Sequence, residues 1–311
     1  MKNNLLTWKK SKGCTIDCEI DLGVMFEGKD ERERFDGKWK EFIASDHDNK
    51  RVFRKRNNKL TYRSEQLIPT KKNKRPPLFL VFGNPATHSV EKGMFFSFKS
   101  KGKENRFWKL ILNSTDLLDL PFDARQSVEK LNAQRRQSLF NLKYDSPFRI
   151  SLGVFISIPS APSGKWGGVI GIEKLIGTKA LRRLEAAERD RVMECSRKFL
   201  TPNGAVITFQ KNAWNGLRSN VDLPYNIDLA KAGKLQGKLK DNPDIPIFGI
   251  PPTRLIGPCR DVLHQALLGF RGQGGGTYLN SSILTDKGAR DTPDRFDQSC
   301  WKEPIWDRLY N

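Results

Sequence analysis

From residue 78 onward, short apolar runs alternate with segments of helical periodicity, and this alternation limits the fold more than any other feature. Leu78-Phe-Leu-Val-Phe is a continuous apolar run that ends at a glycine and a proline, as in a strand buried on both faces of a parallel sheet. The expected strands are 78–82, 150–158, 205–209 and 245–250, and the expected helices are 105–112, 127–140, 179–200, 212–217 and 258–270. Strands that alternate with helices indicate a parallel sheet covered on both faces. We therefore expect a three-layer α/β/α fold around a central, mainly parallel four-stranded sheet.

The first 75 residues have a different pattern of apolar and charged residues. Segments 18–25, 51–54 and 60–63 alternate between apolar and polar residues, as short strands do. Lys71-Lys-Asn-Lys-Arg-Pro-Pro is a like-charge run beside two prolines, which cannot hold regular structure. We expect three parts: a small, basic, β-rich module and linker (1–75), an α/β domain (78–270), and a Gly-rich hinge with a polar tail (271–311).

The formal net charge of +20 indicates a polyanionic partner, because each Lys or Arg placed at a phosphate releases condensed counterions. The basic runs are 50–75, 125–136 and 179–191. The arginines expected to face solvent on the helix at 179–200 are Arg182, Arg183, Arg189 and Arg191. The alternative is a surface whose charge only keeps the protein soluble. The partner that we expect is DNA, either duplex or single-stranded.

The cysteines and histidines do not suggest a metal site. The five cysteines are an odd, scattered set. Cys14 and Cys18 are half of a possible site, but no second Cys or His pair follows nearby. No cofactor or metal is therefore expected. The start of the chain has no signal-peptide pattern and no stretch approaches 18 apolar residues, so we expect a monomeric cytoplasmic (bacterial) or nucleoid-associated protein without a membrane partner.

A chain of motifs follows the first apolar strand. Gly83-Asn-Pro-Ala-Thr-His-Ser is followed by Gly93-Met-Phe-Phe and then by Asn105-Arg-Phe-Trp-Lys at the start of a helix. This succession resembles the uracil-DNA glycosylase superfamily, most closely its mismatch-specific uracil/thymine branch. In that branch an apolar strand ends in Asn-Pro-Gly, a Gly-x-x-Phe follows, and Asn-Arg-Phe-Trp-Lys opens a helix. The motifs span 83–109, and the resemblance in topology spans 78–270.

The resemblance implies roles for the residues of these motifs. Asn84 would hold the attacking water beneath the anomeric carbon of the sugar, and Phe96 would stack on the flipped base. Gly83, Pro85 and Ala86 would contact the base, with backbone N–H groups from Gly83 to Thr87 stabilising its developing negative charge. In isolation, an asparagine before a proline is a common turn residue.

Two later segments fit the same layout. Pro251-Pro-Thr-Arg-Leu follows the fourth strand, where the family has His-Pro-Ser or Asn-Pro-Ser and then a wedge residue. Thr253 would take the place of the family serine in the catalytic set, and Arg254 or Leu255 would fill the space left by the flipped base. Pro251 replaces the family His or Asn, which removes a side-chain donor. The other segment, Phe209-Gln-Lys-Asn-Ala-Trp, follows the third strand, and its Lys211 and Asn212 are expected to contact DNA phosphates.

These observations predict a monofunctional DNA glycosylase, a hydrolase of N-glycosyl bonds in base excision repair that removes uracil or a related deaminated or damaged base. One alternative is a non-catalytic DNA- or RNA-binding protein on the same fold, motivated by Pro251 and by an asparagine in place of an acid. Another is a hydrolase of free nucleosides, which explains Asn84 and Phe96 but not the net charge.

Overall fold

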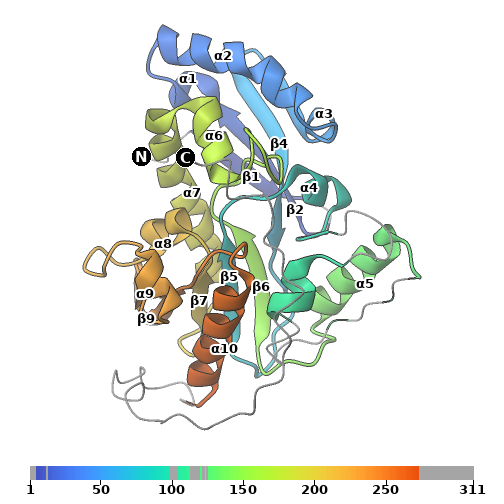
Figure 1. Ribbon diagram of the computed structural model, residues 1–311, viewed down its shortest axis with the longest axis vertical. Coiled ribbons are helices and arrows are strands. Elements are labelled where there is room, and N and C mark those ends of the chain that lie inside the picture. Colours follow the sequence, from blue (N-terminus) through green and yellow to red (C-terminus); the bar gives the residue numbers. More distant parts are fainter. Residues whose placement is uncertain are drawn as a thin grey trace, which may run out of the picture. The chain divides into compact units, whose positions relative to one another are not determined.

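The computed structural model describes residues 5–11, 13–97, 104–112, 120, 123 and 125–272 (Figure 1). All of them belong to one compact unit, Met1–Gly276. The hinge and tail predicted at 271–311 lie outside the described residues, except for the end of the last helix at 271–272.

A single mixed sheet of nine strands runs through the described residues. Its order is β1-β2-β4-β6-β5-β7-β9-β8, and β3 pairs with β4 beside this path. The pairs within β6-β5-β7-β9 are parallel, and all the others are antiparallel. The strands are β1 (Leu6–Lys10), β2 (Thr15–Asp21), β3 (Phe53–Arg56), β4 (Lys59–Leu67), β5 (Pro77–Phe82), β6 (Arg149–Val154), β7 (Ala205–Thr208), β8 (Gln236–Leu239) and β9 (Asn242–Gly249). The α/β class is confirmed, but the sheet is larger than the four strands predicted.

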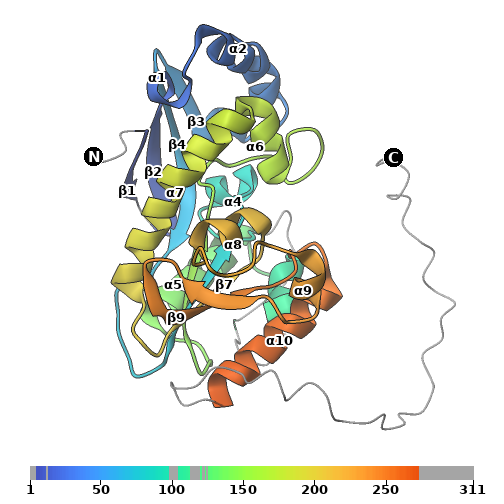
Figure 2. The ribbon, with the colours of Figure 1, turned by 90° about the vertical axis from the view of Figure 1, so that its left-hand side faces the viewer.

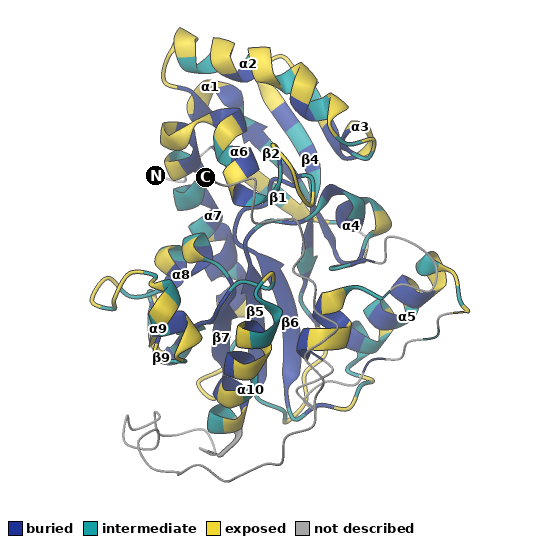
Figure 3. Ribbon diagram, in the orientation of Figure 1, coloured by how far each residue is buried: buried dark blue, intermediate teal, exposed yellow. Residues whose placement is uncertain are grey.

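Helices cover both faces of the parallel strands, and the alternation of side chains along β5 shows why. Phe79 and Val81 point into one core with residues of α2, α6, α7 and α8. Leu80 and Phe82 point into a second core with residues of η1, α5 and α10. Figure 2 shows α7 and α10 on opposite sides of the sheet, and Figure 3 shows β5 buried along its length. The helices are α1 (Leu22–Met25), α2 (Lys29–Ala44), α3 (Asn49–Val52), α4 (Thr87–Lys92), the π-helix η1 (Phe107–Leu112), α5 (Val128–Asn141), α6 (Gly168–Ile176), α7 (Thr178–Phe199), α8 (Lys211–Leu217), α9 (Ile227–Lys231) and α10 (Ile256–Gly272).

The N-terminal strands continue this sheet. The prediction of a separate N-terminal module is therefore corrected. Gln66 and Leu67 at the end of β4 pair with β6. Ile20 and Leu60, from β2 and β4, share a core with Phe79 of β5. The predicted boundary at 75–78 therefore lies within one sheet and one core. Its proline-rich, charged composition marks a loop between two strands and not a boundary between domains.

Helix α2 was not predicted, although its sequence carries the signal. Phe35, Trp39 and Phe42 recur at helical spacing and their rings pack in series, with centroids 5.4 and 5.7 Å apart. Phe42 continues the series to Phe53 of β3. The strand predicted at 18–25 ends earlier, because the side chain of Asp21 accepts the Gly23 N–H at 2.8 Å and starts α1.

Candidate functional site

The parallel strands β6, β5, β7 and β9 all end at one side of the sheet, which we call the carboxyl edge. It consists of the segments that follow these strands, namely 155–161, 83–86, 209–210 and 250–255. Ligands of open α/β sheets bind at this edge. Because β6 and β7 flank β5, Asn84 lies between the segments that follow those two strands, and 250–255 lies one strand further away.

The side chain of Asn84 is held in one orientation. Its Nδ2 donates to the carbonyl oxygen of Ile158 at 3.2 Å and to Ser160 Oγ at 2.9 Å. A peptide carbonyl can only accept, so the amide nitrogen must face Ile158, which fixes the amide orientation. The Ser160 hydroxyl in turn donates to the carbonyl oxygen of Ala161 at 3.1 Å. With its N–H groups directed at these acceptors, the half-buried Asn84 turns Oδ1 away from them, where it can accept a hydrogen bond from water.

The backbone of 83–87 is joined to the segment after β6. Ser160 donates its N–H to the Pro85 carbonyl at 3.1 Å, and Thr87 donates its N–H to the Ser160 carbonyl at 3.0 Å. Ala86 forms a parallel bridge with Ser160, and the Gly83 carbonyl accepts the Ile156 N–H at 2.8 Å. The Thr87 N–H is therefore already used, and the expectation that it would stabilise a departing base is wrong.

Phe96 adopts a strained backbone beside the end of β5. Its φ is +47°, a left-handed conformation that bulky residues rarely adopt and that clusters at functional sites. The half-buried ring stacks on Phe107 with centroids 4.1 Å apart and meets Phe82 edge-on at 4.9 Å. The Trp108 indole N–H donates to the Phe96 carbonyl at 3.1 Å. Asn105 accepts the Phe107 N–H at 2.9 Å at the start of η1.

Side chains from α5 hold the segment that carries Phe96. Asn132 donates to Ser97 Oγ at 2.8 Å, and Arg136 donates to the Gly93 carbonyl at 2.9 Å. Arg135 is fully buried, paired with Glu104. The basic run at 125–136 was expected to face DNA. Two of its arginines instead bind within the protein, Arg135 to Glu104 and Arg136 to the Gly93 carbonyl.

Gln210 occupies the space that the missing side chain of Gly83 leaves open. A Cβ atom on Gly83 would lie 2.0 Å from Gln210 Oε1, so only glycine fits there with Gln210 in place. The half-buried Gln210 carboxamide thus lies at the ends of β5 and β7. Sequence reasoning missed it, although a polar residue directly after an apolar strand was the available signal.

The predicted DNA contacts have different outcomes. Lys211, at the start of α8, is exposed. Asn212 is half-buried and donates its side-chain N–H to Glu185 of α7, so it joins two helices, and its phosphate contact stays a prediction. Arg254 is exposed, whereas Leu255 is half-buried and its carbonyl accepts the Cys259 N–H at 2.8 Å in the first turn of α10.

Thr253 lies at the same edge as Asn84 but is not joined to it. Both residues are described, and no hydrogen bond links them. Pro251, which stands where the glycosylase resemblance would place a His or Asn donor, is buried. The Tyr225 hydroxyl donates to the Ile250 carbonyl at 3.4 Å. Burial raises the pKa of Tyr225 to about 12, so its hydroxyl stays protonated at neutral pH.

A buried polar network lies beneath the segment after β6. The Ser157 N–H donates to Glu188 Oε1 at 2.5 Å, and Arg191 Nε donates to Glu188 Oε2 at 2.6 Å. Arg191 Nη2 also donates to the Val154 carbonyl at 2.6 Å, and the Tyr62 hydroxyl lies 2.6 Å from Ser157 Oγ. Arg191 was expected to face solvent. It is buried because it neutralises Glu188 and satisfies carbonyl groups at the end of β6.

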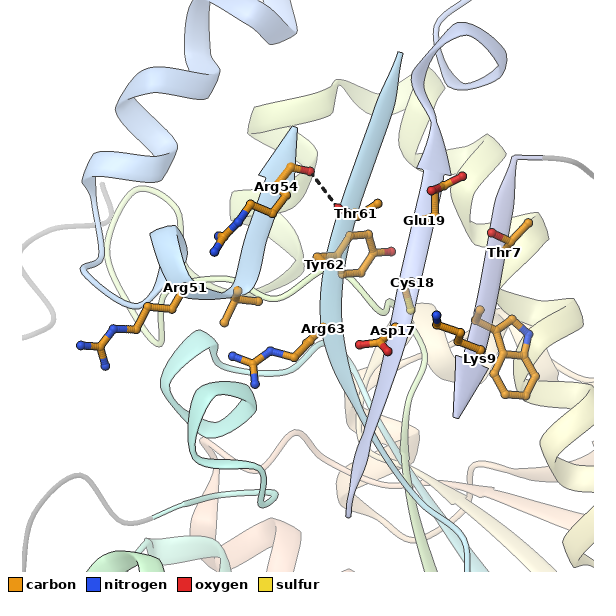
Figure 4. Close-up of a pocket in the computed structure, with 12 residues that line it drawn as sticks. Thr7, Lys9, Asp17, Cys18, Glu19, Arg51, Arg54, Thr61, Tyr62 and Arg63 are labelled. Atoms are coloured by element: carbon orange, nitrogen blue, oxygen red, sulfur yellow. Dashed lines mark hydrogen bonds between the residues drawn. The ribbon is translucent and has the colours of Figure 1, made fainter. Parts of the chain in front are cut away.

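A hollow of about 630 Å³ lies on the open face of β1, β2, β4 and β3 (Figure 4). Cross-strand pairing aligns Lys9 with Asp17 and Asp17 with Arg63, so cations and an anion alternate across this face. Glu19 forms a further ion pair with Lys59 at 2.6 Å. The lining carries both signs of charge, with Asp17 and Glu19 among Lys9, Arg51, Arg54 and Arg63, so it suits a polyanion less well than a surface that carries cations alone.

The described residues include no cluster of His, Cys, Asp and Glu side chains that could hold a metal ion. Burial raises the pKa of Cys195 to about 11 and of Cys18 and Cys259 to about 12, so these thiols are unreactive at neutral pH. Cys14 is also buried, and Cys300 lies outside the described residues. Within the described segments, no helix is both long and apolar enough to cross a bilayer.

Comparison with known proteins gives no family assignment, because no protein-family model matches the chain and no curated protein matches it significantly.

Proposed function

We propose that this protein is a DNA glycosylase that extrudes uracil or a related deaminated base and hydrolyses its N-glycosyl bond. The observation that carries the proposal is the fixed orientation of the Asn84 amide, held by Ile158 and Ser160 at the carboxyl edge. A turn asparagine needs no such partners from another segment of the chain. An amide whose N–H groups are both engaged presents its oxygen as an acceptor, which is the group required to position a water molecule.

The chemistry follows from what an amide can and cannot do. Asn84 Oδ1 accepts a hydrogen bond from water and orients its oxygen, but it does not take up a proton as a carboxylate would. Bond cleavage must therefore run ahead of water attack, through a sugar with oxocarbenium character and a departing base anion. The contribution of Asn84 is placement of the nucleophile, which is worth several powers of ten when the geometry is correct.

Phe96 supports base binding. One face of its ring packs on Phe107, which leaves the partly exposed remainder to stack on an extruded base. Aromatic stacking contributes roughly 1–3 kcal/mol per base, which offsets much of the stacking and pairing lost when a base leaves the duplex. The positive φ of Phe96 is maintained by the Trp108 and α5 contacts, so the ring is positioned before the base arrives.

Arg254 is the best-placed wedge. It is exposed at the carboxyl edge, in the turn before α10, whereas Leu255 is half-buried at the start of that helix. Long side chains inserted between base steps keep the vacated space closed. Lys211 at the start of α8 is exposed and is available for a phosphate of the same duplex.

A second candidate function is a non-catalytic nucleic-acid-binding protein on this fold. The observation that favours it is the buried Pro251, which supplies no side-chain donor where charge would develop on a departing base. A single assay distinguishes the two functions. The full chain is incubated with a labelled duplex that contains one uracil and then treated with alkali. Strand cleavage at the uracil supports the glycosylase, and binding without cleavage over a panel of deaminated bases supports the second candidate.

A further inference from the structure

The loop that joins β4 to β5, residues 68–76, lies at the opposite side of the sheet from the carboxyl edge, and we call it the lysine loop. It contains no helix or strand, but side-chain contacts fix its course. Arg75 Nη1 donates to the carbonyl oxygens of Tyr144 and Ser146 at 3.1 and 3.2 Å, and Nη2 donates to that of Leu142 at 2.9 Å. The end of the loop is therefore anchored to the chain that follows α5.

Arg149, the first residue of β6, anchors the other part of the loop. Its Nη1 donates to the Lys71 carbonyl at 3.4 Å, and its Nη2 donates to the Phe199 carbonyl at the end of α7 at 2.9 Å. The guanidinium also lies over the Phe199 ring, 4.6 Å from its centroid. Residues 71–75 are thus held between the C-terminal ends of α5 and α7.

This arrangement gathers positive charge that the protein does not neutralise. Lys71, Lys72 and Lys74 are exposed, as is Lys143 after α5. In the part of the chain that the structure describes, neither these lysines nor Arg75 and Arg149 form an ion pair. Lysines elsewhere do so, as in the pairs Lys55–Asp36, Lys92–Glu129 and Lys165–Glu41. The lysine loop itself contains no acidic residue.

We propose that the lysine loop, together with Lys143, is a second nucleic-acid contact surface that binds phosphate groups independently of base sequence. Exposed lysines on an anchored backbone lose little freedom when they bind, and each phosphate that they neutralise releases condensed counterions. The surface is distinct from the carboxyl edge, because the six residues of β5 separate the two by about 17 Å. The two edges therefore contact different segments of a nucleic acid.

The composition of the surface favours a nucleic acid over an acidic protein. Protein interfaces are centred on aromatic or other apolar side chains. The exposed large apolar side chains of the described residues, such as Val221 and Ile170, belong to other segments. The exposed residues of the lysine loop, 70–74, are three lysines, a threonine and an asparagine, and these cations and polar groups match a phosphate backbone.

The test measures binding of a lesion-free duplex to the full chain over a series of salt concentrations. The variant is the triple substitution Lys71→Gln, Lys72→Gln and Lys74→Gln. The control removes the same charge from exposed lysines at the other end of the molecule, by Lys29→Gln, Lys40→Gln and Lys174→Gln, which lie outside the three basic runs. The lysine-loop variant should bind more weakly and lose roughly 2–3 units of the slope of log K against log[salt], about 0.9 for each phosphate contact. The control should keep the parental slope.

Equal losses in both triple variants, or no loss in the lysine-loop variant, would overturn the proposal. Equal competition by polyglutamate at matched charge would also overturn it, in favour of an acidic protein. Thermal unfolding of each variant confirms that the fold is intact, and Lys72→Glu provides a single-site version of the same test. Because the duplex carries no lesion and no base release is measured, the result does not depend on the proposed glycosylase activity.

Discussion

The hydroxyl of Thr87 donates a hydrogen bond of 2.9 Å to Oδ1 of Asn49, and both side chains are fully buried. Asn49 belongs to α3 in the N-terminal part of the chain, and Thr87 begins α4 directly after the Asn84 segment. Asn49 Nδ2 also donates to the carbonyl oxygen of Phe42 in α2 at 2.7 Å. One buried amide therefore links the N-terminal helices to the backbone that carries the candidate site.

Replacing Asn49 by alanine should destabilise the protein by about 1–3 kcal/mol, because the Thr87 hydroxyl and the Phe42 carbonyl both lose a buried partner. Urea unfolding measures this change as a lower midpoint with an unchanged slope. Asn220→Ala, at an exposed position, is the control and should leave the midpoint unchanged. Equal midpoints for Asn49→Ala and the parent would show that this link carries no stability.

Deletion of residues 1–70 should prevent folding of the remaining chain. The deletion removes β1–β4, whose apolar side chains share one core with β5 and α7, and exposes one edge of β6. The truncated chain should lack the near-ultraviolet circular dichroism of a packed core and should be poorly soluble. A soluble fragment that unfolds cooperatively would restore the boundary that the sequence suggested at 75–78.

Glu65 should make the protein less stable as pH rises. It is 2% exposed in β4, its Oε1 has no hydrogen-bond partner, and burial raises the pKa of its carboxyl well above the usual range. Below the unfolded pKa of about 4.3 both states are protonated and stability is fully present. Above it, only the unfolded state releases the proton, so stability falls until the folded pKa is reached.

The variant Glu65→Gln carries no proton to release, so its melting temperature should fall less than that of the parent between pH 5 and 8. Glu33→Gln, on the exposed surface of α2, is the control and should follow the parent. The same pH dependence in Glu65→Gln and the parent would contradict the buried, protonated carboxyl.

The sequence predicted the parallel strands because their signal is local and strong. Residues 78–82 form a continuous apolar run, and the structure buries all six residues of β5. The N-terminal boundary was wrong for a physical reason. A charged loop that contains proline looks the same in sequence whether it joins two domains or two strands of one sheet. Only the pairing of β4 with β6 distinguishes these cases, and such pairing connects residues 85 or more positions apart.

Only the part of the candidate site that follows β5 in the sequence was predictable. Asn84 and Phe96 were identified from their motifs, but their partners Ser160 and Trp108 belong to other segments, and Ser160 was not identified. Arg191 was assigned to the outside of α7 because an arginine usually faces solvent. Its burial depends on Glu188, one turn earlier in the same helix, and on carbonyl groups of β6. Neither requirement can be read from helical periodicity.

Breaking the Glu188–Arg191 pair should be costly. Glu188→Ala leaves the Arg191 charge buried without its partner, which should reduce stability by about 3–5 kcal/mol. The double variant Glu188→Ala, Arg191→Met should be more stable than Glu188→Ala, because it no longer buries an unpaired charge. Chemical denaturation of both variants measures the difference, and a double variant that is less stable than the single one would contradict a buried ion pair.

Ser160→Ala should weaken the orientation of Asn84 without removing its carbonyl oxygen. The amide would keep the Ile158 contact and lose the Ser160 contact. Single-turnover base release should therefore slow by about 10-fold, roughly 1.4 kcal/mol in the barrier, with DNA affinity unchanged. The expected order of rates is parent, then Ser160→Ala, then Asn84→Ala. If Ser160→Ala were slower than Asn84→Ala, Ser160 would act in its own right and not through Asn84.

The most direct test of the proposed function is single-turnover release of uracil from a duplex by the parent and by Asn84→Ala, with enzyme in excess. The water-positioning role predicts that Asn84→Ala slows release by roughly 10²-fold or more, a few kcal/mol in the barrier, while DNA affinity stays within about three-fold of the parent. Asn220→Ala should release uracil at the parental rate. An active parent whose Asn84→Ala variant releases uracil just as fast would contradict the account, because Asn84 would then be a turn residue and the water would be held elsewhere.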